Sequence, residues 1–155
     1  MNYTVEIIGE SVGKDGRKII QVSKENFLDL MKDLKSKGYE HLSLITGVDR
    51  KDYMEVVYHL HSLKENQYVV VKVETRDYKI PSVVDLWHSA DWDEREEYDL
   101  MGIIFEGRKD LKRLFLPENW VGHPLRKNYD LKKAQYINVD KEGNDYATFD
   151  EGGGW

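Results

Sequence analysis

The segment Trp92–Gly102, with the sequence WDEREEYDLMG, combines dense acidic charge with aromatic and apolar side chains. Six of the nine residues from Asp91 to Asp99 are acidic, and Arg95 is the only base among them. Asp91 and Glu94 have the spacing of a capping box, and the glycine that closes the segment is a common residue at the end of a helix. We therefore predict a short, highly charged helix here.

Upstream of this segment, the pattern predicts one helix packed on a sheet. Ser23 is a suitable N-cap, and Gly38 is a suitable residue to end the helix. Between them, one apolar stripe recurs at helical spacing: Phe27, Leu30, Met31 and Leu34. Alternating or β-rich stretches predict strands at 3–8, 19–22, 41–47, 54–61 and 68–75, the last two forming an antiparallel hairpin.

A further helix is predicted to open at Pro81–Ser82, because Val83, Leu86, Trp87 and Ala90 recur at the helical interval. Together these elements predict an α+β fold: a two-layer sandwich of a mostly antiparallel sheet with helices on one face. Residues 1–130 form the predicted domain. Apolar residues become sparse beyond it, so residues 131–155 are expected to be an extended C-terminal tail, either disordered or laid on a partner.

Composition excludes several classes of function. The chain has 155 residues, of which 40% are hydrophobic and 34% charged, and this suits one globular domain. Its net charge of −6 argues against nucleic-acid binding. The absence of cysteine removes disulfides, thiol nucleophiles and iron–sulfur ligation. Neither a membrane-spanning apolar run nor a secretory leader is evident, so we expect a cytoplasmic protein.

A basic segment follows the acidic one. Gly122–Tyr129 has the sequence GHPLRKNY, and residues 106–127 carry six Lys or Arg side chains against three acids. The simplest interpretation is that the acidic and basic segments pair within the chain. Arg95 would be held by its acidic neighbours Glu94, Glu96 and Asp99, with Arg113 or Arg126 as the second cation. The sequence leaves open whether such a network is internal or reaches a partner.

Catalytic and metal-binding interpretations find little support. His59 and His61 would project from one face of a strand, but a third and fourth zinc ligand at useful spacing are missing. The carboxylates lack the Glu-x-x-His repeats of di-metal sites, and no apolar pocket is evident that would raise a carboxyl pKa. A solvated helix face is the plain alternative. The interleaved Trp92, Tyr98, Leu100 and Met101 favour a protein interface instead.

Two longer motifs resemble a known family. They are WHSADWDEREEYDLMGIIF at Trp87–Phe105 and DLKRLFLPENWVGHPLRKNY at Asp110–Tyr129. They are similar to the signature of the C subunit of NADH-quinone oxidoreductase, the 30 kDa subunit family of respiratory complex I. The resemblance covers roughly residues 24 to 130. The chain departs from the family in having Arg108–Lys109 where His-Pro is common, and Asn128 in place of Asp.

The resemblance implies a non-catalytic docking subunit of a complex I-like electron-transfer enzyme. Such a subunit lies at the cytoplasmic side of the cell membrane and packs on the hydrogenase-like large subunit of D or 49 kDa type, near the small iron–sulfur subunit. Iron–sulfur clusters, or a nickel–iron centre, would belong to partner subunits. The alternatives are the same subunit of an energy-converting membrane-bound hydrogenase, or a stand-alone carboxylate-dependent hydrolase. The implied structural or interface residues are Trp92, Glu94, Arg95, Glu96, Asp99, Arg113, His123, Pro124 and Arg126.

Overall fold

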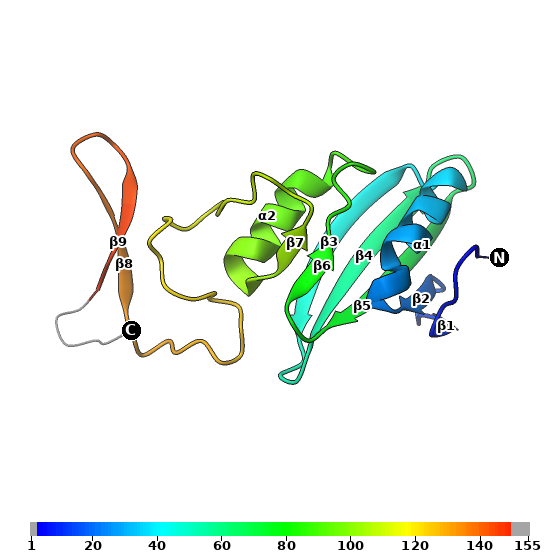
Figure 1. Ribbon diagram of the computed structural model, residues 1–155, viewed down its shortest axis with the longest axis horizontal. Helices are drawn as coiled ribbons and strands as arrows, with labels where there is room; N and C mark the ends of the chain where they lie inside the picture. Colours follow the sequence, from blue (N-terminus) through cyan, green and yellow to red (C-terminus); the bar gives the residue numbers. More distant parts are fainter. Residues whose placement is uncertain (1–2, 150–155) are drawn as a thin grey trace.

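The computed structural model describes residues 3–149 and contains a five-stranded mixed sheet (Figure 1). The strand order is β1-β2-β5-β4-β3, with β2 and β5 parallel and the other neighbours antiparallel. The strands are β1 (Gly9–Val12), β2 (Lys18–Val22), β3 (His41–Asp49), β4 (Met54–Ser62) and β5 (Gln67–Thr75). The predicted α+β class with a mostly antiparallel sheet is therefore confirmed, including the hairpin of the two central strands.

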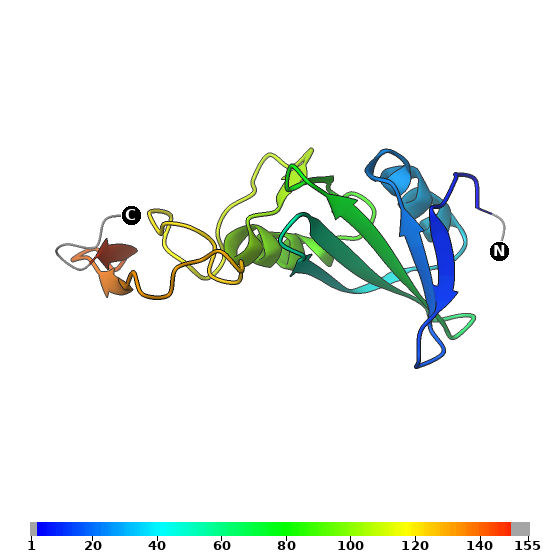
Figure 2. The same cartoon turned by 90° about the horizontal axis from the view of Figure 1, so that it is seen from below.

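One helix, α1 (Lys24–Ser36), covers one side of the sheet (Figure 2). As predicted, the Ser23 side chain accepts a hydrogen bond from the Asn26 N–H, and Gly38 follows the helix with a φ of 90°. The predicted apolar stripe is fully buried, and the Phe27 ring lies 4.8 Å from that of Tyr58 on β4. The inward residues of β4 and β5 complete this core: Met54, Val56, Tyr58, Leu60, Val69, Val71 and Val73.

Two boundaries near the start and middle of the chain differ from the prediction. Residues 3–8 alternate because Tyr3, Val5 and Ile7 pack against the core, but pairing in the sheet begins only at Gly9. Pro81 does not open a helix, because it ends the strand β6 (Lys79–Pro81), which pairs in parallel with β7 (Ile104–Glu106). Val83 and Trp87 after Pro81 are buried outside any helix, since the chain is redirected there by hydrogen bonds to Glu94.

The acidic segment forms the second helix, α2 (Ala90–Met101), which lies beside the edge strand β3 (Figure 1). Gly102 ends it in the left-handed conformation, with a φ of 70°, as predicted. The predicted capping box is wrong. The helix starts at Ala90 after Ser89, which makes no side-chain capping bond, and Glu94 points elsewhere.

After β7 the chain continues without regular structure to a two-stranded ribbon that extends away from the body (Figures 1 and 2). The ribbon, residues 131–149, contains β8 (Gln135–Val139) and β9 (Asp145–Phe149), a pairing that the sequence did not reveal. Two amide side chains fasten it to the preceding loop. Asn119 bonds the N–H and C=O of Ala147 at 2.8 and 2.9 Å, and Gln135 bonds those of Val121 at 2.9 and 2.8 Å.

Neither helix in the described part of the chain is long and apolar enough to cross a membrane. His59 and His61 do lie on the sheet face opposite the core, where the His61 ring stacks on Tyr68 at 3.9 Å. Residues 3–149 contain no group of three His, Cys, Asp or Glu side chains placed to hold a metal ion.

Candidate functional site

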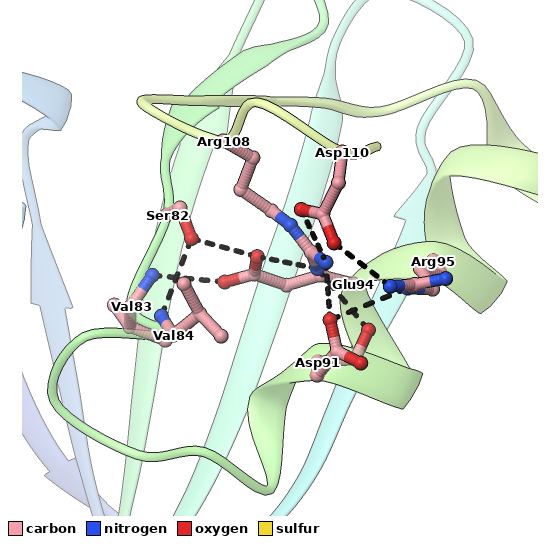
Figure 3. Close-up of polar contacts among 8 residues, drawn as sticks. All are labelled: Ser82, Val83, Val84, Asp91, Glu94, Arg95, Arg108 and Asp110. Atoms are coloured by element: carbon pink, nitrogen blue, oxygen red, sulfur yellow. Dashed lines mark hydrogen bonds and ion pairs between the residues drawn. The ribbon is translucent and has the colours of Figure 1, made fainter. Parts of the chain in front are cut away.

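The site is built on α2, whose carboxylates point in several directions and bind three parts of the chain: the turn after β6, the loop after β7 and the edge strand β3. Glu94, fully buried, faces the turn after β6 (Figure 3). Its carboxylate accepts hydrogen bonds from the Val83 N–H and the Ser82 hydroxyl, both at 2.8 Å. Burial raises the pKa of Glu94, against the opposing effect of these bonds and of Arg108.

Arg108 is the cation that compensates this buried carboxylate. Its side chain is only 1% exposed, and its Nη1 lies 3.3 Å from Glu94 Oε2. Its Nη2 forms a short ion pair with Asp91 and lies 3.4 Å from Asp110 Oδ1 (Figure 3). Arg95 lies at the outer side of the same cluster, where it pairs with Asp91 at 3.3 Å and with Asp110 at 2.9 Å. Two arginines thus hold three carboxylates together.

Asp99, on another face of α2, organises the loop after β7. Its Oδ2 accepts the consecutive N–H groups of Leu114, Phe115 and Leu116 at 2.7–3.0 Å. Successive N–H groups that converge on one anion form a backbone nest. Arg113 Nη1 pairs with Asp99 Oδ1 at 2.7 Å. Burial acts to raise the pKa of Asp99, but these N–H donors and Arg113 outweigh it, so the pKa lies below its ordinary value.

The basic segment Gly122–Tyr129 binds the C-terminal end of α2 through backbone carbonyls. The last carbonyls of a helix lack internal partners and carry the negative end of its dipole. His123 Nδ1 lies 2.9 Å from the Asp99 carbonyl oxygen, and the Leu125 N–H donates to that of Leu100 at 3.0 Å. Arg126 donates to the carbonyls of Met101 and Gly102 at 2.6 and 3.0 Å.

Two features of this end of the helix follow from its geometry: the tautomer of His123 and the glycine at position 102. A carbonyl can only accept, so the His123 ring must carry its proton on Nδ1. Burial, with Arg126 and Arg113 nearby, lowers the pKa of His123, which favours the neutral form of the ring. A Cβ at Gly102 would collide with His123 and Arg126, and the residue also has a positive φ. Only glycine fits both requirements.

The edge of the sheet is closed by two further carboxylates of α2. Asp93 accepts the Ile45 N–H, and Glu97 accepts the Gly47 N–H, each at 2.8 Å. Residues four apart on a helix rise about 6 Å, and residues two apart on a strand about 6.6 Å, so the two spacings match. A Cβ at Gly47 would lie 2.7 Å from Glu97 Oε2. The helix therefore satisfies an edge strand that would otherwise expose unpaired donors.

We predict that replacing Glu97 by glutamine makes the protein more stable at alkaline pH. Burial, with smaller contributions from Glu96 and Asp93, raises the pKa of Glu97 from 4.5 to about 7. Between these values the folded protein binds a proton that the unfolded chain has lost, so this residue's contribution to stability falls as pH rises through the window. Glutamine removes the charge and keeps the acceptor.

At pH 8 the Glu97→Gln variant should be more stable on the order of 2 kcal/mol, with little difference at pH 4.5. Urea unfolding at both pH values measures this, with Glu65→Gln as a control that should show no such gain, because Glu65 is exposed in the turn between β4 and β5. A gain in stability for Glu97→Gln that is equal at both pH values would contradict a raised pKa of Glu97.

The structure brings together most of the predicted site residues, with different partners from those expected. Arg95 does not pair with Glu94, Glu96 or Asp99; it pairs with Asp91 and Asp110. Arg113 does pair with Asp99, whereas Arg126 binds carbonyls and stacks over Tyr78 at 4.3 Å. Pro124 lies partly buried between His123 and Leu125. Trp92 and Glu96 are exposed and take no part in the network.

Sequence reasoning missed Arg108, the most buried cation of the site. In the sequence, Arg108–Lys109 stands out only as a departure from the family pattern and as part of the positive charge of residues 106–127. Asp91, Asp93, Glu97 and Asp110 were also missed as specific partners. Nothing in spacing alone distinguishes them from the solvated acids of an ordinary helix.

Comparison with known proteins identifies related sequences and structures. The sequence profile of the family described as respiratory-chain NADH dehydrogenase, 30 kDa subunit, matches residues 20–135. The chain belongs to this family. The C subunit of the NADH-quinone oxidoreductase of Citrifermentans bemidjiense is 41% identical over 123 residues, 76% of each chain. That of Erythrobacter litoralis is 39% identical over 142 residues, which are 88% of this chain and 57% of the relative.

The C/D subunit of the Ectopseudomonas mendocina enzyme is 36% identical over 138 residues, and the match covers 79% of this chain but only 23% of that longer protein. Among solved structures, the trypsin-resistant fragment (1–134) of Nqo5 superposes with a TM-score of 0.63 at 34% identity, covering 66% of this chain and 89% of the fragment. A chain of the archaeal membrane-bound sulfane sulfur reductase has a TM-score of 0.71 at 24% identity, covering 88% and 89%. This second likeness concerns the fold alone.

Proposed function

We propose that this 30 kDa-family chain is a non-catalytic subunit that docks on the D-type, hydrogenase-like large subunit of a complex I-like electron-transfer enzyme. The observation that carries this proposal is the ribbon of residues 131–149. Six large apolar side chains are exposed on it: Leu131, Tyr136, Ile137, Val139, Tyr146 and Phe149. Within the ribbon only Ala147 is buried. An isolated two-stranded ribbon is marginally stable in water, so its apolar surface suits burial against another protein.

The composition of the relatives supports the D-type subunit as that protein. The matching segment is a minor part of the C/D subunits of Ectopseudomonas mendocina, Baumannia cicadellinicola and Phocaeicola vulgatus, covering 23–26% of each. In these relatives, one polypeptide named for both the C and the D subunit contains both parts. We infer that the same two parts meet as separate chains here.

The internal network supports a structural role for most of the charged motif. Glu94, Asp99 and Arg113 are satisfied within the domain, so they hold α2, the turn after β6 and the loop after β7 in place. This arrangement is a support for the docking surfaces and not a reaction centre. Iron–sulfur chemistry is then carried by partner subunits, including a small iron–sulfur subunit, and the chain reaches the cytoplasmic side of the membrane through the complex.

The relatives favour the quinone type of enzyme over the hydrogenase alternative. The C and C/D subunits of NADH-quinone oxidoreductases are 35–41% identical to this chain. No observation supports a stand-alone hydrolase, since Glu94 and Asp99 are buried and engaged with other parts of the chain.

We predict that removing apolar side chains from the ribbon weakens binding to the D-type subunit. The full chain should co-purify with the D-type subunit of the same organism. The Ile137→Ser/Phe149→Ser variant should bind it at least about tenfold more weakly, because apolar anchors dominate such interfaces. Biolayer interferometry with the purified partner measures the difference.

The matched control is Ile8→Ser/Val12→Ser, which removes two apolar side chains at the opposite end of the chain that are even more exposed than Ile137 and Phe149. It should bind like the wild type. Failure of the wild-type chain to bind the D-type subunit would refute the proposal, and unchanged binding of the ribbon variant would exclude the ribbon as the docking surface.

A further inference from the structure

A second exposed surface lies on the outward face of α2, apart from the ribbon. We call it the α2 patch; it comprises Trp92, Glu96 and the half-buried Leu100 on α2, with Phe115 and Leu125 on the loops bound to the C-terminal part of the helix. Trp92, Phe115 and Leu125 are 64%, 57% and 61% exposed. Three large apolar side chains this exposed, on one helix and the loops bound to it, are unusual on a free surface.

The geometry of the helix makes three of these residues neighbours. Trp92, Glu96 and Leu100 are spaced four apart, so they follow one stripe along α2. The other two residues are attached to the end of this stripe through the backbone. The Phe115 N–H donates to Asp99 at 2.7 Å, and the Leu125 N–H donates to the Leu100 carbonyl at 3.0 Å. The patch is therefore held by the same bonds that organise the site.

Glu96 differs from every other carboxylate of α2. Asp91, Asp93, Glu94, Glu97 and Asp99 all accept hydrogen bonds or form ion pairs within the domain. Glu96 is exposed and has no such bond to any residue between 3 and 149. Its charge also lies near that of the buried Glu97, whose pKa it helps to raise. A cation placed at Glu96 would relieve this repulsion.

We propose that the α2 patch binds a partner segment in which an arginine or lysine is flanked by apolar side chains. The cation pairs with Glu96 and stacks on the Trp92 ring, and the flanking side chains cover Leu100, Phe115 and Leu125. Tryptophan is the best cation–π partner and is enriched among the dominant residues of interfaces. The identity of the partner as the D-type subunit rests on the proposed function; the chemistry of the contact does not.

A solvated helix face would explain an exposed glutamate but not its surroundings. Such faces are occupied by charged side chains, whereas the residues one turn before and one turn after Glu96 are Trp92 and Leu100. A strictly apolar contact with a second copy of this chain would leave the Glu96 carboxylate buried without a partner, which is unfavourable. A cationic segment satisfies both the carboxylate and the apolar side chains.

Photo-crosslinking tests the patch in the assembled complex. The full chain, with p-benzoylphenylalanine at position 92, is expressed in its own organism and irradiated in isolated membranes. Mass spectrometry should find a crosslinked peptide of another subunit with a Lys or Arg close to the crosslinked residue. A crosslink to a subunit other than the D type would support the patch as a binding surface but refute the D-type subunit as its partner. Crosslinks only within the chain or to a second copy, or to a peptide without a base, would overturn the patch.

Charge reversal provides a quantitative test with the purified D-type subunit. Glu96→Lys should weaken binding at least about tenfold at low salt, and Glu96→Gln should reduce the salt dependence of the affinity. The control is Glu65→Lys, an exposed acid in the turn between β4 and β5, far from α2 (Figure 1). If the wild type binds and Glu96→Lys binds equally well, the patch proposal fails while the proposed function stands.

Discussion

Replacing Asp99 with alanine should lower the free energy of unfolding by about 4 kcal/mol, because a buried charge with several donors is removed at once. The loop around Leu114–Leu116 has no regular secondary structure, and its three N–H groups have Asp99 Oδ2 as their acceptor. Arg113, whose side chain is 11% exposed, would lose its carboxylate partner as well.

Hydrogen exchange distinguishes this mechanism from general destabilisation. In the wild type the amides of Leu114, Phe115 and Leu116 should be protected, and in Asp99→Ala they should exchange like amides of an open loop while those of β4 and β5 stay protected. Asp110→Ala is the control, since that carboxylate is 62% exposed. Protection of the three amides that persists in Asp99→Ala would contradict the nest.

The Asp99 effect should also depend on pH in a defined direction. The pKa of Asp99 is lowered in the folded protein, so its contribution is fully present above the ordinary value of 3.8. It is lost as pH falls through the lowered folded-state value. The stability difference between wild type and Asp99→Ala should therefore be constant near neutrality and shrink in strong acid.

Replacing Arg108 with methionine is the second large effect, with an expected loss of about 3–5 kcal/mol. The substitution leaves Glu94, which is fully buried, without its cation. Because burial already raises the pKa of Glu94, the carboxyl can escape the penalty by taking up a proton. The loss should therefore be greater at pH 8 than at pH 5, as urea unfolding can measure.

A double variant separates lost charge compensation from lost packing. Glu94→Gln/Arg108→Met should be more stable than Arg108→Met at pH 8, because no charge then remains buried. Lys109→Met, at an exposed neighbouring position, is the control and should be within about 0.5 kcal/mol of the wild type. A double variant that is no more stable than Arg108→Met would show that the loss comes from packing.

Periodic patterns predicted the regular part of the fold well. The stripe of α1 and the alternation of β4 follow from repeats of 3.6 and 2 residues, which reflect one buried face. The same logic failed after Pro81, where Val83 and Trp87 are buried at helical spacing but lie outside any helix. The spacing of these residues reflects the burial of their side chains, and the hydrogen bonds from Ser82 and Val83 to Glu94 fix the path of the backbone.

Local sequence by itself determined the helix ends at Ser23, Gly38 and Gly102, the hairpin of β4 and β5, and the family. These depend on neighbouring residues, whose propensities and spacing are written in the chain. Only the tertiary structure decided which charge meets which. Arg95 and Arg108 are the same residue type in the sequence. In the structure, however, Arg95 lies at the outer side of the cluster, whereas the side chain of Arg108 is 1% exposed. Ion pairs join residues distant in sequence, and their partners follow from burial and packing geometry, which no local pattern records.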